Sequence, residues 1–210
     1  MEIVWLGHSA VRLRSVTTTL VTDPYPPGLG ISMGSQKADI VTISNRHPHH
    51  AFVQGLEGEP KVVNGPGEYE ISNFYITGIG TPRSQDPMDR EVNTIYVFHA
   101  EGLTLCHLGD LGRPLTPRQV EELGQPDVLF VPAGGVCTLE PARMVETVRL
   151  IQPAIVVPIH YGLEGLEVEL GPVDEFLRAL EASDVVTPNR LNVTTNNVPR
   201  QLRVAILNKA

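Results

Sequence analysis

An apolar run that ends in a cluster of histidines is the most constraining feature of this chain. Residues 38–43 read Ala-Asp-Ile-Val-Thr-Ile, as a buried strand does, and residues 44–50 follow as Ser-Asn-Arg-His-Pro-His-His. Three of the chain's seven histidines thus lie within four residues, at the end of a rigid element. Imidazole is the commonest protein ligand for zinc and similar metals, so the pattern predicts a metal site. The alternative is a solvated, histidine-rich loop.

Two further histidines also follow apolar runs. His107 comes after residues 103–106 and precedes Leu, Gly and Asp110, and His160 comes after residues 154–159 and precedes Tyr and Gly162. Glycine lets the backbone turn sharply, which leaves the preceding polar side chain at the carboxyl end of the strand. We therefore expect three strands to bring His and Asp side chains to one edge of the fold.

The chain changes character near its middle. Its first half consists mainly of short strand-like runs, at residues 3–6, 11–14, 18–22, 74–79, 93–98 and 103–107. In its second half, helices alternate with buried strands: helices at 116–123, 139–151 and 172–182, strands at 127–132, 154–159 and 202–207. This order favours an α/β sandwich of two face-to-face sheets with helices outside. No linker-like stretch interrupts residues 1–210, which predicts a single domain.

Charge and composition exclude several classes of function. The formal net charge is −8 and no basic cluster is present, so nucleic acid is not an expected partner. No apolar run approaches the ~20 residues that span a bilayer, and the N-terminus has no signal-peptide pattern. Two cysteines without a CxxC pair favour a reducing, cytoplasmic location. A small anionic substrate is compatible with the charge, since a bound metal supplies positive charge locally.

Several short motifs in a fixed order resemble one known family. The chain resembles the metallo-β-lactamase-fold hydrolases, and among them the small branch similar to L-ascorbate-6-phosphate lactonase. The motifs, nearly end to end, are Trp-Leu-Gly-His-Ser at 5–9, Thr-Asp-Pro at 22–24, the cluster at 44–50, Gly-Pro-Gly-Glu-Tyr-Glu at 65–70, His-Leu-Gly-Asp at 107–110, Val-Pro-Ala-Gly-Gly at 131–135 and Pro-Ile-His-Tyr at 158–161. The resemblance implies a four-layer αββα sandwich, a site for one or two metal ions along the sheet edges, and assembly as a homo-oligomer.

The family's metal-binding signature, HxHxDH, is altered in this chain. Here it reads NxHxHH: Asn45 stands at the first histidine and His49 at the aspartate, while His47 and His50 match. An amide oxygen is a poor zinc ligand beside an imidazole. Because His49 replaces a carboxylate, it makes the site more positive and changes how protons are transferred.

The resemblance implies a ligand set, residue by residue. The first metal ion would keep His47 and His107, with Asp110 if it bridges. The second would take His50, His160, Asp110 and, if it can reach, His49. Zinc is the expected ion, with manganese or iron as alternatives, in one or two copies.

The expected function is metal-dependent hydrolysis. A metal-bound hydroxide would attack an ester, lactone or phosphoester, with His49 and Asp110 as the catalytic residues. The alternative is a catalytically impaired protein that keeps the fold as a binding or assembly module, because two signature ligands are changed.

Several other residues are candidates for the pocket. Asn45, Asp23, His8 and Glu68 are expected around the metal ligands, with a purely structural role as the alternative for each. Arg46 and Arg83 could bind a substrate anion or only be solvated. Cys106 is expected in the core, and Cys137 nearer the rim without an assigned role. The polar loop 81–91 is expected to border the site.

Overall fold

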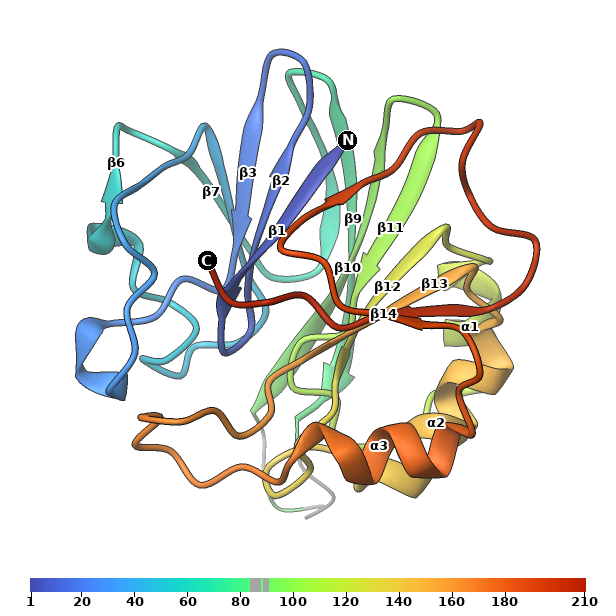
Figure 1. Ribbon diagram of the computed structural model, residues 1–210. Helices are drawn as coiled ribbons and strands as arrows, with labels where there is room; N and C mark the ends of the chain where they lie inside the picture. Colours follow the sequence, from blue (N-terminus) through green and yellow to red (C-terminus); the bar gives the residue numbers. More distant parts are fainter. Residues whose placement is uncertain (84–87, 89–90) are drawn as a thin grey trace.

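Two large β-sheets form the framework of the computed structural model, which describes residues 1–83, 88 and 91–210 (Figure 1). The six-stranded sheet runs, in spatial order, β15 (Leu191–Asn192), β1 (Glu2–Gly7), β2 (Ala10–Arg14), β3 (Thr19–Thr22), β5 (Ile40–Ile43) and β7 (Lys61–Asn64). The eight-stranded sheet runs β14 (Val185–Val186), β16 (Arg203–Ala205), β13 (Ile155–Ile159), β12 (Val128–Pro132), β11 (Leu103–His107), β10 (Val92–Ala100), β9 (Phe74–Pro82) and β8 (Gly67–Ile71). Strands β4 (Gln36–Lys37) and β6 (Leu56–Glu57) form a small third sheet.

Three α-helices in the described part of the chain lie beside the eight-stranded sheet (Figure 1). They are α1 (Pro117–Leu123), α2 (Pro141–Ile151) and α3 (Val173–Leu180). Helix α1 begins at Thr116, whose side chain accepts the N–H of Gln119 in a capping box, and it ends at Gly124. Helix α2 packs on the sheet through Met144, Val145, Val148 and Ile151, the face that the sequence spacing predicted.

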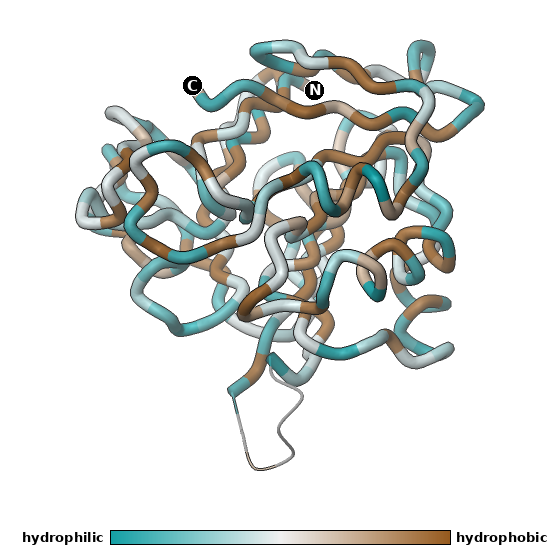
Figure 2. Tube along the Cα trace, turned by 60° about the horizontal axis from the view of Figure 1, so that its bottom comes forward, coloured by the Kyte–Doolittle hydropathy of each residue, from teal (hydrophilic) through white to brown (hydrophobic). Residues whose placement is uncertain are grey.

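The six-stranded sheet is apolar on both faces because its strands alternate apolar residues between two cores. Ile3 and Trp5 of β1 join the large core between the sheets, whereas Val4 and Leu6 join a second core on the outer face. Figure 2 shows the resulting hydrophobic stretches along the central strands and hydrophilic ones along the outer loops.

The outer core of the six-stranded sheet is covered by loops in the described residues. This cover includes the 3₁₀ turns η1 (Pro27–Leu29) and η2 (Val53–Gly55) together with the small third sheet. The predicted α/β class and paired sheets are therefore confirmed, although the fourth layer of the expected αββα sandwich is formed by these turns and not by an α-helix.

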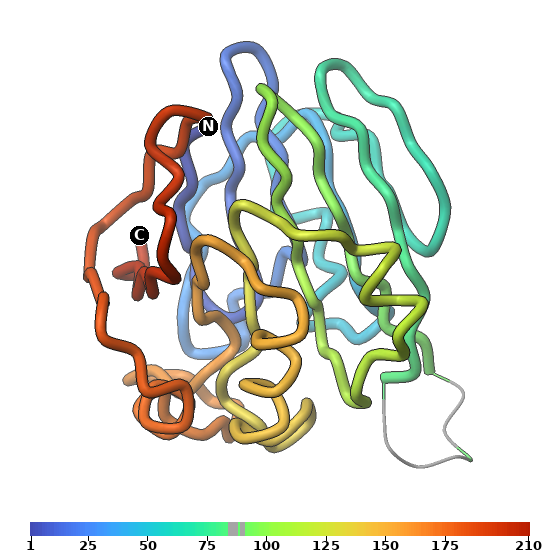
Figure 3. Tube along the Cα trace, turned by 90° about the vertical axis from the view of Figure 1, so that its right-hand side faces the viewer, coloured from blue at the N-terminus to red at the C-terminus, as the bar shows by residue number. Residues whose placement is uncertain are grey.

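The ends of several strands meet along one edge. β3, β5 and β7 are parallel neighbours in one sheet, and β11, β12 and β13 are parallel neighbours in the other. The last part of the chain returns to the first strand, as Figure 3 shows, where β15 pairs with β1 and the N–H of Ala210 donates to the carbonyl of Trp5. Parallel strands that end together bring residues far apart in sequence to one place.

Candidate metal centre

Three residues at the edge where the sheets meet have a left-handed backbone. His8 follows β1 with φ 49°, Asp23 follows β3 with φ 40°, and His160 follows β13 with φ 51°. Non-glycine residues rarely adopt such angles, and they cluster at functional sites because the surrounding structure must hold them there. All three side chains are buried.

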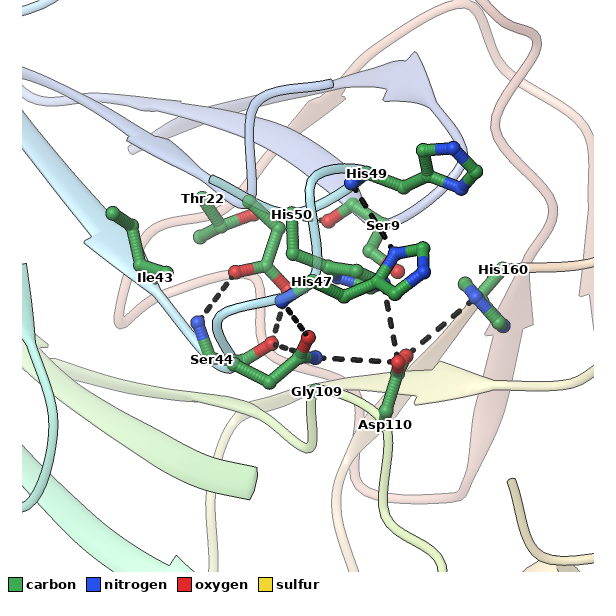
Figure 4. Close-up of polar contacts among 12 residues, drawn as sticks. Ser9, Thr22, Ile43, Ser44, His47, His49, His50, Gly109, Asp110 and His160 are labelled. Carbon is green, nitrogen blue, oxygen red and sulfur yellow. Dashed lines mark hydrogen bonds and ion pairs between the residues drawn. The ribbon is translucent and has the colours of Figure 1, made fainter. Parts of the chain in front are cut away.

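His50 is held between two buried carboxylates. Asp23 accepts the N–H of Ser44 at 2.7 Å and the hydroxyl of Ser44 at 2.6 Å, and its Oδ2 lies 3.0 Å from His50 Nδ1. On the other side of the ring, His50 Nε2 lies 3.1 Å from Asp110 Oδ2 (Figure 4). Asp23 therefore fixes the imidazole so that Nε2 faces Asp110, as a partner behind a metal ligand does.

Burial opposes the charged form of His50, but Asp110 and Asp23 outweigh it and raise the pKa of His50 to about 10. The ion-free ring therefore carries an extra proton at pH 7, which binding of a metal at Nε2 must displace. Burial alone would also raise the pKa of Asp110, yet His50, His160 and Arg83 hold that pKa well below its usual range. Asp110 is thus ionised at any physiological pH.

Ring nitrogens of three histidines converge beside Asp110, whose Oδ1 lies 3.5 Å from His160 Nε2. His8, His50 and His160 offer ligand nitrogens that all lie within 4.8 Å of one another. His8 Nδ1, His160 Nδ1 and Asp110 Oδ1 are buried and have no hydrogen-bond partner. Burial lowers the pKa of His160 to about 4 and that of His8 well below its usual range, so both rings are neutral at pH 7. Buried polar atoms are almost always satisfied. The neutral rings of His8 and His160, with His50 once it gives up its extra proton, fit a divalent metal ion such as zinc beside the carboxylate.

A second group of potential ligands adjoins the first. Asp110, Cys137 and His160 also have ligand atoms within 4.8 Å of one another. Desolvation and the carboxylate of Asp110 raise the pKa of the Cys137 thiol to about 11, so the thiol keeps its proton at pH 7 without an ion.

The expected first metal position is not assembled. His107 lies at the end of β11, where Nε2 is 3.0 Å from the carbonyl of Ser9 and Nδ1 accepts the N–H of Gly109 at 3.1 Å. Both ring nitrogens are therefore bound to the backbone, which leaves no lone pair for a metal. His107 therefore joins neither group of close ligand atoms in the described residues, and its role as a metal ligand stays a prediction.

Asn45 turns a donor, and not an oxygen, towards the site. Its Oδ1 accepts the N–H of His47 at 3.0 Å, and its Nδ2 lies 3.2 Å from Asp110 Oδ2. Arg83 approaches the same carboxylate oxygen, with Nε 3.5 Å away, and also pairs with Glu91. Asp110 Oδ2 therefore lies near Asn45, Arg83 and His50, whereas Oδ1 lies 3.5 Å from His160 Nε2.

His47 and His49 lie at the rim. Their rings are 4.5 Å apart between centroids and half-buried, and the His49 ring is 6.1 Å from that of His8. Neither belongs to a group of three close ligand atoms in the described residues. Figure 4 shows the His49 ring turned away from Asp110. His8 therefore stands closer to the other ligands than His49, which the sequence had suggested for this position.

A cavity of about 660 Å³ adjoins the cluster through Ser44 and Asn45. Its other lining residues are Arg46, Asn64, Gly65, Pro66, Glu91, Val92 and Thr94. Glu68 is exposed on β8 and is not among them. Of the loop 81–91 that was expected to border the site, residues 84–87 and 89–90 lie outside the described part of the chain.

Three residues lie closer to the site than the sequence analysis predicted. His8 follows a strand as His160 does, and the shared pattern of an apolar run, a histidine and a small residue is the signal that marks it. Arg83 and Cys137 carry no such signal, because each reaches the site from a loop whose path depends on the whole fold.

Comparisons with known proteins identify the family of this chain. The profile of the beta-lactamase superfamily domain matches residues 2–160. A metal-dependent hydrolase of the UPF0173 family from Archaeoglobus fulgidus is 25% identical over 214 residues, covering 87% of this chain and 91% of that protein. Another from Lysinibacillus sphaericus is 27% identical over 196 residues, covering 77% and 86%.

A solved structure resembles the chain over nearly its whole length. It is a candidate Zn-dependent hydrolase of the metallo-beta-lactamase superfamily from Thermotoga maritima, 35% identical, with a TM-score of 0.79. The match covers 99% of this chain and 98% of that one. The chain therefore belongs to the metallo-beta-lactamase superfamily of metal-dependent hydrolases.

Proposed function

We propose that this protein hydrolyses a small ester, lactone or phosphoester with a single metal ion, zinc in the first instance. The ion is held by His8, His50, His160 and Asp110. The observation that carries the proposal is the close approach of ring nitrogens of His8, His50 and His160 beside Asp110, where the buried Nδ1 atoms of His8 and His160 have no hydrogen-bond partner. A bound zinc ion would supply an activated water and polarise the bond that breaks.

The choice of one ion rests on what occupies the other side of Asp110. Asn45 Nδ2 and Arg83 Nε approach Oδ2, and His107 has no free nitrogen. The guanidinium of Arg83 supplies a fixed positive charge beside Asp110, where the resemblance implied a second ion.

The surrounding residues define the proposed roles. Asp23 orients His50 through the Nδ1 contact, which keeps Nε2 aimed at the metal position. His49 stays a candidate for proton transfer, because its half-buried ring lies at the rim of the cluster. Burial and the nearby charge of His50 lower the pKa of His49, which favours that neutral form.

A substrate with a negative charge fits the cavity best. Arg46 lines it, and Arg83 lies beside Asp110 at the same edge. Two guanidinium groups can bind a carboxylate or phosphate on the substrate. A lactone or phosphoester that carries such a group follows from this placement and from the resemblance to the lactonase branch.

Metal analysis tests the proposal directly. Protein purified without chelator or nickel tag should contain close to one equivalent of zinc, manganese or iron. Less than about a tenth of an equivalent, with no uptake on reconstitution, would exclude the metal site. A content of two ions would exclude the single-ion site.

A panel of anionic and neutral lactones, esters and phosphodiesters then tests the activity. Arg83→Gln should raise KM for anionic substrates at least about tenfold and leave neutral ones unchanged. Arg149→Gln, an exposed arginine on α2, is the matched control. A metal-loaded protein that turns over nothing in the panel, while Asn45→His with His49→Asp does, would favour the binding or assembly module.

We further propose a cytoplasmic location and assembly with other copies of this chain. Cys106 is buried and Cys137 is exposed, and both are free thiols, as a reducing compartment favours. No helix in the described residues is long and apolar enough to cross a membrane.

A further inference from the structure

Cys137 has no part in the proposed ligand set, yet its sulfur adjoins that set. Its Sγ, a carboxylate oxygen of Asp110 and a ring nitrogen of His160 all lie within 4.8 Å of one another. Asp110 and His160 are each 1% exposed, and Asp110 Oδ1 and His160 Nδ1 have no hydrogen-bond partner. Cys137 is exposed as a residue, so it stands on the solvent side of these two buried partners.

The loop that carries Cys137 is fixed between the segments that carry the other two residues. On one side, the N–H groups of Ala133 and Gly134 donate to the carbonyls of Ile159 and His160, at 2.9 and 3.0 Å. On the other side, the N–H of Leu139 donates to the carbonyl of Leu111 at 2.8 Å. The loop therefore holds its sulfur at a defined place next to both partners.

The turn before Cys137 is strained. Val136 has φ 60°, which a β-branched residue rarely adopts, and its side chain is 72% exposed. The carbonyl of Gly135 accepts the N–H groups of Cys137 and Thr138 at 2.8 and 3.3 Å, which closes the turn. Because Val136 is exposed, its burial does not compensate for the strain of its backbone. We take the strained turn to position Cys137, the next residue.

We propose that Cys137 is a thiolate ligand of the metal ion, together with Asp110 and His160. This inference rests on the proposed metal-dependent function and adds a sulfur donor to the candidate ligands of its site. As the sulfur–metal bond forms, the S–H bond breaks and its proton passes to solvent. A thiolate also makes the donor set softer, which favours zinc or iron over manganese or magnesium.

Cobalt(II) substitution tests the ligand, because a thiolate bound to cobalt gives an intense near-ultraviolet charge-transfer band. The cobalt-loaded wild-type protein should show this band, and Cys137→Ser should lose it while keeping the weaker visible bands of bound cobalt. Cys106→Ala, which removes the buried cysteine in β11, is the control and should retain the band.

Proton release gives a second, independent measurement. Titration of ion-free protein with zinc in weakly buffered solution should release about one proton fewer from Cys137→Ser than from the wild type. The variant should also bind zinc at least about tenfold more weakly.

The outcomes separate this inference from the proposed function. Wild-type protein that binds cobalt without the charge-transfer band, or a band that survives Cys137→Ser, overturns the cysteine ligand and leaves the metal hydrolase in place. A wild-type protein that binds neither cobalt nor zinc overturns both.

Discussion

The backbone N–H of His160 donates a 2.9 Å hydrogen bond to the carbonyl oxygen of His8. His8 ends a strand of the six-stranded sheet, and His160 ends a strand of the eight-stranded sheet. The two sheets are therefore joined at two residues of the proposed metal site. Their ring centroids are 4.5 Å apart, so the join also sets the spacing of the ligands.

Replacing His8 should remove metal without unfolding the protein. In His8→Gln the cluster loses one of its three close ring nitrogens, and zinc affinity should fall at least about tenfold. Competition with a colourimetric chelator measures the change. His99→Gln, at an exposed position on β10, is the control and should bind as the wild type does. Equal affinity in both variants would show that His8 is not a ligand.

Replacing His107 should have the opposite effect. His107→Leu leaves the carbonyl of Ser9 and the N–H of Gly109 without their buried partners, which should lower the free energy of unfolding by about 2 kcal/mol. Metal content should not change. Urea denaturation and metal analysis of the same preparation check both statements, and loss of metal with unchanged stability would restore His107 as a ligand.

Gly109 should tolerate no side chain. Its φ is 57°, and a Cβ there would lie 2.3 Å from Asn93 Oδ1, which accepts the N–H of Asp110. Gly109→Ala should therefore cost at least about 2 kcal/mol and weaken metal binding, because the turn that places Asp110 must move. Gly28→Ala, where a Cβ meets nothing within 4 Å, serves as the control in thermal denaturation. Similar melting temperatures for the two variants would contradict the tight turn.

The ion-free protein should lose stability as it is acidified. Burial lowers the pKa of His160 from 6.5 to about 4, so between these values the unfolded chain binds a proton that the folded chain does not. As the pH is lowered through this window, the free energy of unfolding should decrease by about 1.4 kcal/mol per pH unit for each such histidine. The lowered pKa of His8 changes the stability in the same direction. His50 adds no slope there, because its raised pKa of about 10 keeps it protonated in both states below 6.5.

Urea denaturation in the presence of chelator, at several pH values from about 7 to about 5, measures this slope. His160→Gln should reduce it, and a slope that the substitution leaves unchanged would show that His160 is not the titrating group.

Relief of the strained turn should stabilise the protein. Asparagine adopts left-handed angles more readily than valine, so Val136→Asn should raise the free energy of unfolding by about 1 kcal/mol. The exposed valine gives up little packing. Val16→Asn, at another exposed valine, is the control and should be neutral or slightly destabilising. A destabilised Val136→Asn would mean that the turn needs its valine.

Much of the fold follows from local pattern. The strands β1, β2, β3, β5, β10 and β11 and the three α-helices lie where alternation, capping and apolar periodicity predict them. The short strands β14 and β15 carry no such pattern, because they exist only by pairing with β16 and β1. The sequence also could not predict that turns cover the outer face of the six-stranded sheet, since loops have no hydrophobic periodicity.

The site was predictable as a location but not as a set of ligands. Runs that end in His50, Asp110 and His160 identify one edge of the sheets. Which way each side chain turns depends on backbone angles and distant partners: His107 is drawn to Ser9, and His8 is turned inward by its left-handed conformation. Arg83 meets Asp110 only because β9 ends beside the turn after β11.

The left-handed strand ends set a limit on how stable this protein can become. At His8, Asp23 and His160, glycine or asparagine would suit the backbone better, so selection for heat resistance alone would replace these residues first. Each replacement would remove a proposed metal ligand or the group proposed to orient one. A variant library selected only for melting temperature should therefore become enriched in inactive proteins with substitutions at these three positions. A second selection, for metal uptake, should retain the original residues there and so identify the metal site without a structure.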